Sequence, residues 1–315
     1  EQPFIDHFEV IQGFGISSTP TQLWRVLRSA SALSQSSHEK DQGFAQDLAL
    51  FISLVTTSAR TKRMACDLLS DLGNHPGVEK LIAQIKLPDD SLLSAIRRGV
   101  LRAMNTVPLA GSEYALTDFQ FRLWSRLKSL SAGAVSAPTS AGKSFVVIEH
   151  LCKRAIESKT FGAIFIAPTR ALLAEIQQKL SNRLQAYSES IRVSTIPTFD
   201  QDDRPKQIFV LTQERLQVLL TITDEVFDLV IADEAQGIGD DSRGIILQDS
   251  LEKLAARGSS TQFLFLAPGA SGFPALADAV NLEQIDVHET ELSPVVQNRI
   301  IVQKAPTDET QLHLS

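Results

Sequence analysis

A run of small residues between an apolar stretch and a helical pattern constrains this chain more than any other feature. Residues 136–144 have the sequence Ser-Ala-Pro-Thr-Ser-Ala-Gly-Lys-Ser and follow the apolar stretch 133–135. Small side chains let successive backbone N–H groups curl around an anion, and a helix that starts near Gly142 adds its dipole. The pattern predicts a phosphate-binding loop in a strand–loop–helix unit. A chance Ala- and Gly-rich loop is the alternative.

The loop carries the groups that a nucleoside triphosphate and its metal ion need. Lys143 would reach the β- and γ-phosphates, and Ser144 would ligate Mg²⁺. One departure from the usual motif is visible, because Ala137 stands where the first glycine usually lies. The residues expected to surround the phosphates are Pro138, Thr139, Ser140, Ala141, Gly142, Lys143 and Ser144.

Two acids follow another apolar run, about ninety residues downstream of the loop. Asp233 and Glu234 come directly after the run 229–232. A carboxylate at the end of a strand can hold the metal ion, here Asp233, and its neighbour can orient and deprotonate an attacking water. The alternative is two solvated acids that cap the next helix. Together with Lys143, the acids indicate an ATP hydrolase with ATP and Mg²⁺ as cofactors.

From about residue 116, short apolar runs alternate with helical stretches. Continuous apolar runs are typical of strands that are buried on both faces. Their alternation with helices predicts right-handed crossovers and a mostly parallel sheet flanked by helices, an α/β fold. Ligands of such sheets bind at the carboxyl ends of the strands, where all these motifs fall. The expected strands are 133–135, 163–166, 191–194, 208–211, 229–232 and 263–266.

Residues 1–115 have the apolar periodicity of helices and carry no chemical motif that we recognise. We therefore expect an all-α domain before the α/β domain. Its basic clusters at 60–63 and 97–102 could contact phosphates, although a solvated helix face is the commoner role. The expected helices are 3–12, 20–34, 42–57, 59–72, 77–85 and 89–104.

Composition excludes several classes of protein. No apolar run reaches the roughly 20 residues of a membrane span, and the start is unlike a signal peptide, so we expect a cytoplasmic protein without membrane partners. A net charge of -7 argues against a protein that coats nucleic acid, but a motor needs only a local groove of donors. Cys66 and Cys152 are expected to be buried thiols without a disulfide.

Three further segments decide the class of ATPase. Residues 167–172 follow the second expected strand, 211–216 follow the strand before the acid pair, and Phe119-Gln120 precedes the loop by just over twenty residues. In this order the segments resemble those of the superfamily 2 helicases, most of all the Ski-type DExH group. The resemblance covers about 116–303 and implies a RecA-like ATP-binding domain.

The resemblance also implies roles for single residues. Gln120, next to Phe119, would read the adenine. The sequence Asp-Glu-Ala-Gln resembles the DExH box with Gln236 in place of the usual His, which adds Gln236 to the candidate catalytic residues Lys143, Asp233 and Glu234. Strand-contacting motifs would hold the nucleic-acid backbone without reading bases, and a structural capping role is the open alternative for each residue. The candidates are Thr169, Arg170, Thr212 and Arg215.

One motif departs from the family pattern. Such helicases carry Ser-Ala-Thr after the next strand, whereas this chain has Ala267, Pro268 and Gly269. Both hydroxyls at the aligned positions are missing. Since that motif links the ATP state to strand separation in the family, we expect inefficient unwinding.

The family's motors use two RecA-like domains, and the second supplies arginines that stabilise charge on the γ-phosphate. Residues 291–296 and 298–302 resemble the strand and hinge that lead out of the first domain. We expect domains at 1–115 and 116–303, with 304–315 starting the missing second RecA-like domain. The chain would then be a fragment of a larger helicase that by itself binds ATP weakly and hydrolyses it slowly.

Three functions are open at this point. The first is the ATP-binding half of a helicase or translocase on single-stranded DNA or RNA, with DNA slightly preferred. The second is an ATP-gated scaffold whose helical domain docks a nuclease or other protein, an analogy with some bacterial anti-phage systems that the altered third motif favours. The third is an ATPase of the AAA type, against which stand the segments 167–172 and Phe119-Gln120.

Overall fold

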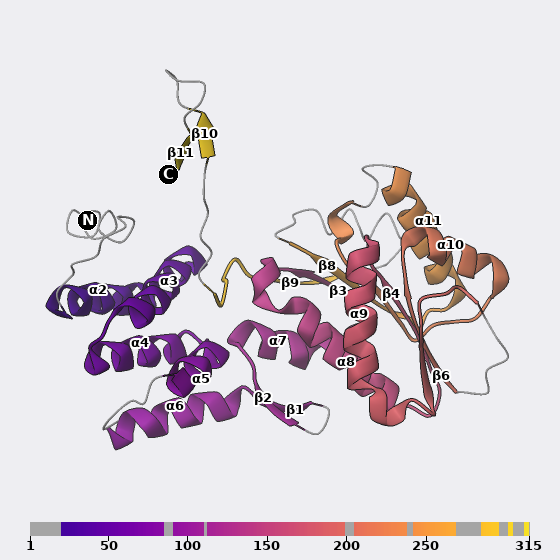
Figure 1. Cartoon of the computed structure of the whole chain (residues 1–315). Helices are drawn as coiled ribbons and strands as arrows, with labels where there is room; N and C mark the ends of the chain where they lie inside the picture. Colours follow the sequence, from indigo (N-terminus) through magenta and orange to yellow (C-terminus); the bar gives the residue numbers. More distant parts are fainter. Residues whose placement is uncertain are drawn as a thin grey trace.

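The computed structural model describes residues 20–84, 91–109, 112–198, 205–237, 242–268 and 285–295, with two short strands at 302–304 and 312–314. A region of helices lies at one end of the molecule and a region built on a sheet lies at the other (Figure 1). The expected helix 3–12 and the position of Gly269 fall outside the described residues.

The helices of the first region pack around an apolar core. They are α2 (Pro20–Leu33), α3 (Glu39–Val55), α4 (Ala59–Asp71), α5 (His75–Gln84) and α6 (Leu92–Met104). The expected helices in this part are confirmed, with ends shifted by up to about three residues. The core comes from α2 to α5, including Leu27, Ile52 and Leu69, which are 2% exposed or less. We call α2 to α6 the helical region.

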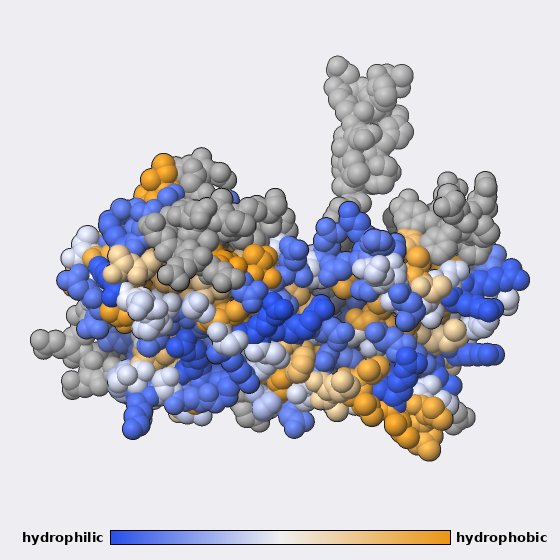
Figure 2. All heavy atoms as spheres, turned by 180° about the vertical axis from the view of Figure 1, so that it is seen from behind, coloured by the Kyte–Doolittle hydropathy of each residue, from blue (hydrophilic) through white to orange (hydrophobic). Residues whose placement is uncertain are grey.

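Helix α6 departs from the others because its apolar side faces outward. Its one buried residue is Arg98, which pairs with Asp67 of α4. Its large apolar side chains form a patch at the lower right of Figure 2. These side chains are exposed by between 54% and 82%, and they are Leu92, Leu93, Ile96, Val100 and Met104.

The expected all-helical stretch is wrong over its last residues. Strands β1 (Thr106–Leu109) and β2 (Ser112–Ala115) form an antiparallel hairpin. The β-branched pair Thr106 and Val107 and the missing amide proton of Pro108 disfavour a continued helix. Val107 and Leu109 are buried in the core of the sheet region, so the hairpin packs with that region.

The second region contains a seven-stranded sheet in which all neighbouring strands are parallel. The expected α/β class is confirmed, and each expected strand is present. In spatial order the strands are β5 (Ile191–Ser194), β6 (Lys206–Leu211), β4 (Phe161–Ile166), β7 (Leu229–Ala232), β8 (Gln262–Ala267), β3 (Ala132–Ser136) and β9 (Asp286–Glu289).

Strand β9 was not expected. The strand that we expected at 291–296 is wrong for residues 291–295, which pair with no strand. The cause is the position of β9 at the edge of the sheet. An edge strand needs no continuous apolar run, and of the four residues of β9 only His288 is buried.

Helices cover both faces of the sheet (Figure 1). On one face α7 (Asp118–Leu127), α8 (Lys143–Glu157) and α9 (Arg170–Arg183) share a core with inward-facing strand residues. On the other face lie α10 (Gln213–Ile222) and α11 (Ser242–Arg257). From β3 the chain crosses to β4, and β7 and β8 later fill the positions between these two strands. In such sheets, ligands bind at the carboxyl ends of the strands, at the point where successive connections change direction.

Two smaller expectations can also be compared with the described residues. Cys66 and Cys152 are both free and buried, as expected. Burial raises the pKa of the Cys66 thiol to about 11 and that of Cys152 to about 12. Within the described ranges, no helix has the length and apolar character that a membrane crossing requires.

Candidate functional site

The sheet brings the candidate residues to one edge. Strands β6, β4, β7, β8 and β3 are neighbours in that order, and all point the same way. Their carboxyl ends lead into Thr212, Pro168, Asp233, Pro268 and the phosphate loop, respectively. Segments that are far apart in sequence therefore form a continuous row, with the nucleotide candidates at one end and the nucleic-acid candidates at the other.

The phosphate loop is anchored to the neighbouring strand and turns sharply before α8. Ala137 is fully buried, and its N–H donates to the carbonyl of Ala267 at 3.2 Å. Gly142 has a φ of +74°, a conformation that other residues rarely adopt. The positive φ favours glycine here, and a Cβ on Gly142 would lie 2.4 Å from Nε2 of Gln120, so the Gln120 side chain would have to move.

Helix α8 begins without a capping side chain of its own. The N-cap residue of this 15-residue helix is Gly142, which has no side chain that could accept from the first N–H groups. Thr139 is exposed at the tip of the loop, while Pro138, Ser140 and Ser144 are half-buried and Ala141 is buried. Free N–H groups and the positive end of the helix dipole are the features that bind phosphates.

Lys143 and Asp233 are buried and interact electrostatically. Lys143 is 5% exposed, and its Nζ donates to the carbonyl of Ala137 at 3.2 Å. Burial lowers the pKa of Lys143, while the charges of Asp233 and Glu234 oppose that shift. Burial raises the pKa of Asp233, and the Glu234 amide and Lys143 oppose it. The loop and the acid pair, about ninety residues apart in the chain, thus lie close enough for their charges to interact.

Glu234 has a backbone that the sequence did not signal. Its φ is +52°, which costs of order 1 kcal/mol or more for a residue other than glycine. Its N–H donates to Oδ1 of Asp233 at 2.9 Å. Its side chain is exposed, as is that of Gln236 in the short helix that follows, at 235–237. The turn holds Asp233 inside and leaves Glu234 accessible to solvent.

The donors fit a magnesium ion that is held mainly by its nucleotide. Among the described residues, no group of three or more His, Cys, Asp or Glu could hold a metal by itself. Mg²⁺ in phosphate-handling sites keeps several waters and takes one or two protein ligands plus phosphate oxygens. Asp233 and the Ser144 hydroxyl, at the two sides of the site, could supply such a partial set.

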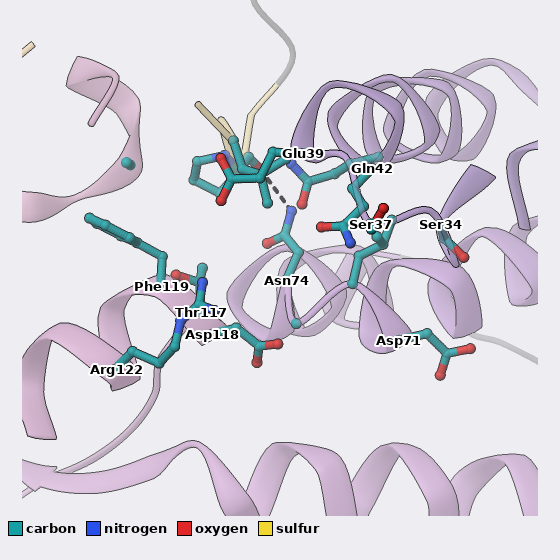
Figure 3. A pocket seen from close by; sticks show the side chains of 16 residues that line it. Ser34, Ser37, Glu39, Gln42, Asp71, Asn74, Thr117, Asp118, Phe119 and Arg122 are labelled. Atoms are coloured by element: carbon teal, nitrogen blue, oxygen red, sulfur yellow. Dashed lines mark hydrogen bonds between the residues drawn. The ribbon is translucent and has the colours of Figure 1, made fainter. Parts of the chain in front are cut away.

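Gln120 and Phe119, at the start of α7, contact different parts of the sheet region. Gln120 is 9% exposed and forms a capping box with Thr117. Its Nε2 also donates to the carbonyl of Ala141 at 3.0 Å, which ties α7 to the phosphate loop. The Phe119 ring is buried and stacks on His288 with a centroid distance of 4.9 Å. Figure 3 shows that ring pointing away from the neighbouring cavity.

The candidate nucleic-acid residues lie at the starts of α9 and α10. Thr169 caps α9 by accepting from the N–H of Leu172 at 3.2 Å. Thr212 caps α10 by accepting from the N–H of Arg215 at 3.5 Å, and Arg215 donates to the carbonyl of Thr195 at 2.8 Å. Arg170 is exposed. The capping alternative is therefore observed for both threonines, and it leaves the two helix N-termini on the same edge.

Two contributions escaped the sequence analysis. Arg243 of α11 donates to Glu214 at 2.9 Å and to the carbonyl of Pro168 at 3.0 Å, so it joins the two strand-end segments. Residues 290–295 run past the phosphate loop, where the Ser293 and Ser140 hydroxyls lie 2.7 Å apart. Both contacts join segments that are distant in sequence, and no local pattern signals them.

Comparison with known proteins agrees with this geometry. Residues 117–268 match the DEAD/DEAH box helicase family model. ATP-dependent DNA helicase Hel308 of Thermoplasma acidophilum is 29% identical over 146 residues, which are 44% of this chain and 21% of that protein. Anti-bacteriophage protein B of Escherichia coli is 30% identical over 165 residues, 49% of this chain and 21% of that protein. The chain thus spans about a fifth of these relatives.

Two solved structures are also similar. The helicase domain of Pyrococcus furiosus Hef has a TM-score of 0.42 and 16% identity, over 54% of this chain and 38% of that one. The DUF1998 helicase MrfA bound to DNA has a TM-score of 0.45 and 14% identity, over 57% of this chain and 28% of that one.

The family match covers a defined part of this chain. It begins at Thr117, directly before α7, and ends at Pro268 after β8. It supports a helicase-type, ATP-binding domain in this part of the chain. The helical region and residues 290–295 lie outside the match.

Proposed function

We propose that this chain is the ATP-binding half of a superfamily 2 nucleic-acid helicase or translocase, close to the Ski-type DExH group. The observation that carries the proposal is that the phosphate loop with buried Lys143, and buried Asp233, follow parallel strands at the same edge of the sheet, close enough for the two charges to interact. The boundary of the ATP-binding domain would lie between α6 and β1 rather than at the expected residue 116, because Val107 and Leu109 belong to the core of the sheet region. The whole protein would have a cytoplasmic setting.

In this proposal Lys143 exchanges the carbonyl of Ala137 for β- and γ-phosphate oxygens, a stronger partner for an ammonium group. Asp233 and Ser144 hold Mg²⁺, which neutralises charge on the phosphates when bound. Glu234, exposed on its strained turn, orients the attacking water and accepts its proton. Gln236 lies beside this turn, and Gln120, next to Phe119, would read the adenine.

A single strand of nucleic acid would lie across the starts of α9 and α10. Thr169, Arg170, Thr212 and Arg215, with the two helix N-termini, would contact backbone phosphates without reading bases. Single-stranded DNA is the preferred partner because one relative is a DNA helicase. Strand separation would be inefficient, since Ala267 and Pro268 lack the hydroxyls of the family's third motif.

Full hydrolysis would require a second RecA-like domain. Relatives about five times the length of the matched segment support such a partner domain in a longer protein. An arginine supplied in trans contributes about 10³-fold or more to phosphoryl transfer. The 315-residue chain alone is therefore expected to hydrolyse ATP slowly.

Calorimetric titration of the chain with ATP and Mg²⁺ tests the site. Lys143→Ala should weaken ATP binding by about 10- to 100-fold, because it removes a charged hydrogen-bond donor. Lys153→Ala, on the same helix but exposed and paired with Glu157, is the matched control and should change the affinity less than about twofold. Equal affinities for the two variants would refute the assignment, and fast DNA-stimulated turnover by this chain would refute the need for a second domain.

A second candidate function is an ATP-gated scaffold that docks a nuclease or another protein. The outward apolar side of α6 favours it, because large exposed apolar patches mark interaction sites. One relative is named an anti-bacteriophage protein, which supports a role in antiviral defence. In the longer protein, a scaffold would lose its partner when the helical region is deleted and keep it in Lys143→Ala, whereas a motor would stop moving on DNA in Lys143→Ala.

A further inference from the structure

A cavity of about 390 Å³ lies between the helical region and α7, next to the phosphate loop. Its walls come from α3, from the turn between α4 and α5, from the start of α7 and from residues 290–295. Figure 3 shows Asn74 near the centre, with Gln42 and Glu39 of α3 on one side and Asp118 of α7 on another. Ala141, directly before Gly142, also lines it.

Residues 290–295 join the helical region to the phosphate loop. On one side the N–H of Thr290 donates to the carbonyl of Ser136 at 3.0 Å, and Ser293 contacts Ser140. On the other side, side chains of the helical region hold the same segment. Glu39 accepts from the Glu291 N–H at 2.8 Å, Asn74 donates to the Pro294 carbonyl at 2.9 Å, and Gln46 donates to the Ser293 carbonyl.

The turn before α5 also packs closely against α7. The N–H of Asp118 donates to the carbonyl of Gly73 at 3.2 Å, and the Asp118 carboxylate accepts from Asn105. Gly73 has a φ of +71°, and a Cβ there would lie 2.2 Å from Cγ of Asp118. The position of Asp118 is therefore determined by the helical region as well as by α7.

The chemistry of the walls is unsuited to polyphosphate. Three carboxylates line the cavity, those of Glu39, Asp71 and Asp118, against the single cation Arg122. The remaining polar groups are mainly amides and hydroxyls, including Gln42 and Thr117. Carboxylates accept hydrogen bonds from sugar hydroxyls, and amides can pair with the edge of a base. The walls suit an uncharged polar group.

We propose that this cavity holds the nucleoside end of the bound nucleotide, so that the helical region forms part of the nucleotide site. This rests on the proposed function, which places the phosphates on the adjacent loop. Gln42 would contact the base or sugar from α3, and Asp118 would accept from a ribose hydroxyl. Nucleotide affinity then depends on residues outside the helicase-type match.

Calorimetry with two ligands, ATP and inorganic tripolyphosphate, each with Mg²⁺, separates the two ends of the site. Gln42→Ala and Asp118→Asn should each weaken ATP binding by about 3- to 10-fold and leave tripolyphosphate binding unchanged. Asp118→Asn keeps the oxygen that accepts from Asn105. Gln35→Ala is the matched control, since Gln35 is exposed and outside the cavity. Thermal unfolding checks that the variants fold. If Asp118→Asn does not fold, the comparison of Gln42→Ala with the wild type decides the test.

The result with Lys143→Ala separates a failure of the nucleoside-binding cavity from a failure of the proposed ATP-binding function. If Lys143→Ala weakens both ligands while the two cavity variants bind ATP like the wild type, the inference is wrong and the phosphate site stands. If Lys143→Ala changes neither ligand, the proposed function fails, and the inference fails with it.

Discussion

The two regions of this molecule use their apolar residues differently. In the sheet region, both faces of the sheet are covered, and strand residues such as Ile164, Phe165 and Phe209 are at most 1% exposed. In the helical region, α6 buries Arg98 against α4 and turns Leu93 and Ile96 outward. Apolar side chains are thus buried on both faces of the sheet, whereas α6 forms ion pairs with α4 and α5 and presents its apolar side to the outside.

The largest effect should come from the centre of the sheet. Phe165→Ala removes a ring that is completely buried in β4, and we expect a loss of about 3–5 kcal/mol in the free energy of unfolding. Urea denaturation measures it. A loss below about 1 kcal/mol would show that the two regions differ less in packing than their burial indicates.

Acid should weaken the sheet region through His150. Burial lowers the pKa of His150 to about 4, below that of the unfolded chain. The folded state favours the neutral imidazole, so the free energy of unfolding is unaffected by His150 above about pH 6.5. It decreases as the pH falls towards 4, by about 2 kcal/mol at pH 5. Unfolding measured at pH 7.5 and 5 should show a smaller difference in His150→Asn.

His75 provides the counterpart in the helical region. Burial lowers the pKa of His75 as well, but the charges of Asp118 and Glu79 oppose the shift. His75→Asn should therefore change the pH dependence less than His150→Asn does. A larger change for His75→Asn would contradict this ranking.

The ion pairs that hold α6 should have an intermediate effect. Arg98→Ala leaves Asp67 without its partner at a partly buried position, and we expect a loss of about 1–2 kcal/mol. Arg102→Ala, which breaks a more exposed pair with Glu79, is the control and should cost less than about 1 kcal/mol. Equal losses in the two variants would mean that burial does not decide the strength of these pairs.

The smallest effect should come from the outward side of α6. Leu93 is 82% exposed, so Leu93→Ala should change the free energy of unfolding by less than about 0.5 kcal/mol. Leu27→Ala, at a buried position of α2, is the contrast and should cost about 2–5 kcal/mol. A large loss in Leu93→Ala would show that α6 packs on its apolar side after all.

Most of the sheet was predictable because its signals are local. Each central strand has its own apolar run, and the phosphate loop and Asp233 follow such runs directly. Strand β9 lacked that signal at the sheet edge, and the hairpin β1–β2 was hidden behind a helical pattern. Both elements exist because of the strand with which they pair, β3 for β9 and β2 for β1, and local composition does not reveal such partners.

The site was predictable to the same extent. The proximity of Lys143 to Asp233 follows from strand ends that share one edge of a parallel sheet. The stacking of Phe119 on His288 and the positive φ of Glu234 arise from tertiary packing, and no sequence pattern indicated them. The cavity is lined by segments that are far apart in the sequence, so its existence depends on how they pack together.

The course of residues 290–295 has a mechanical consequence. One short stretch of backbone is fastened to the phosphate loop through Ser140 and Ser136, and to the helices through Glu39 and Asn74. A force that displaces these residues would act on both sets of contacts at once. Because the same six residues contact both parts, a displacement of the phosphate loop would be transmitted through them to the helical region.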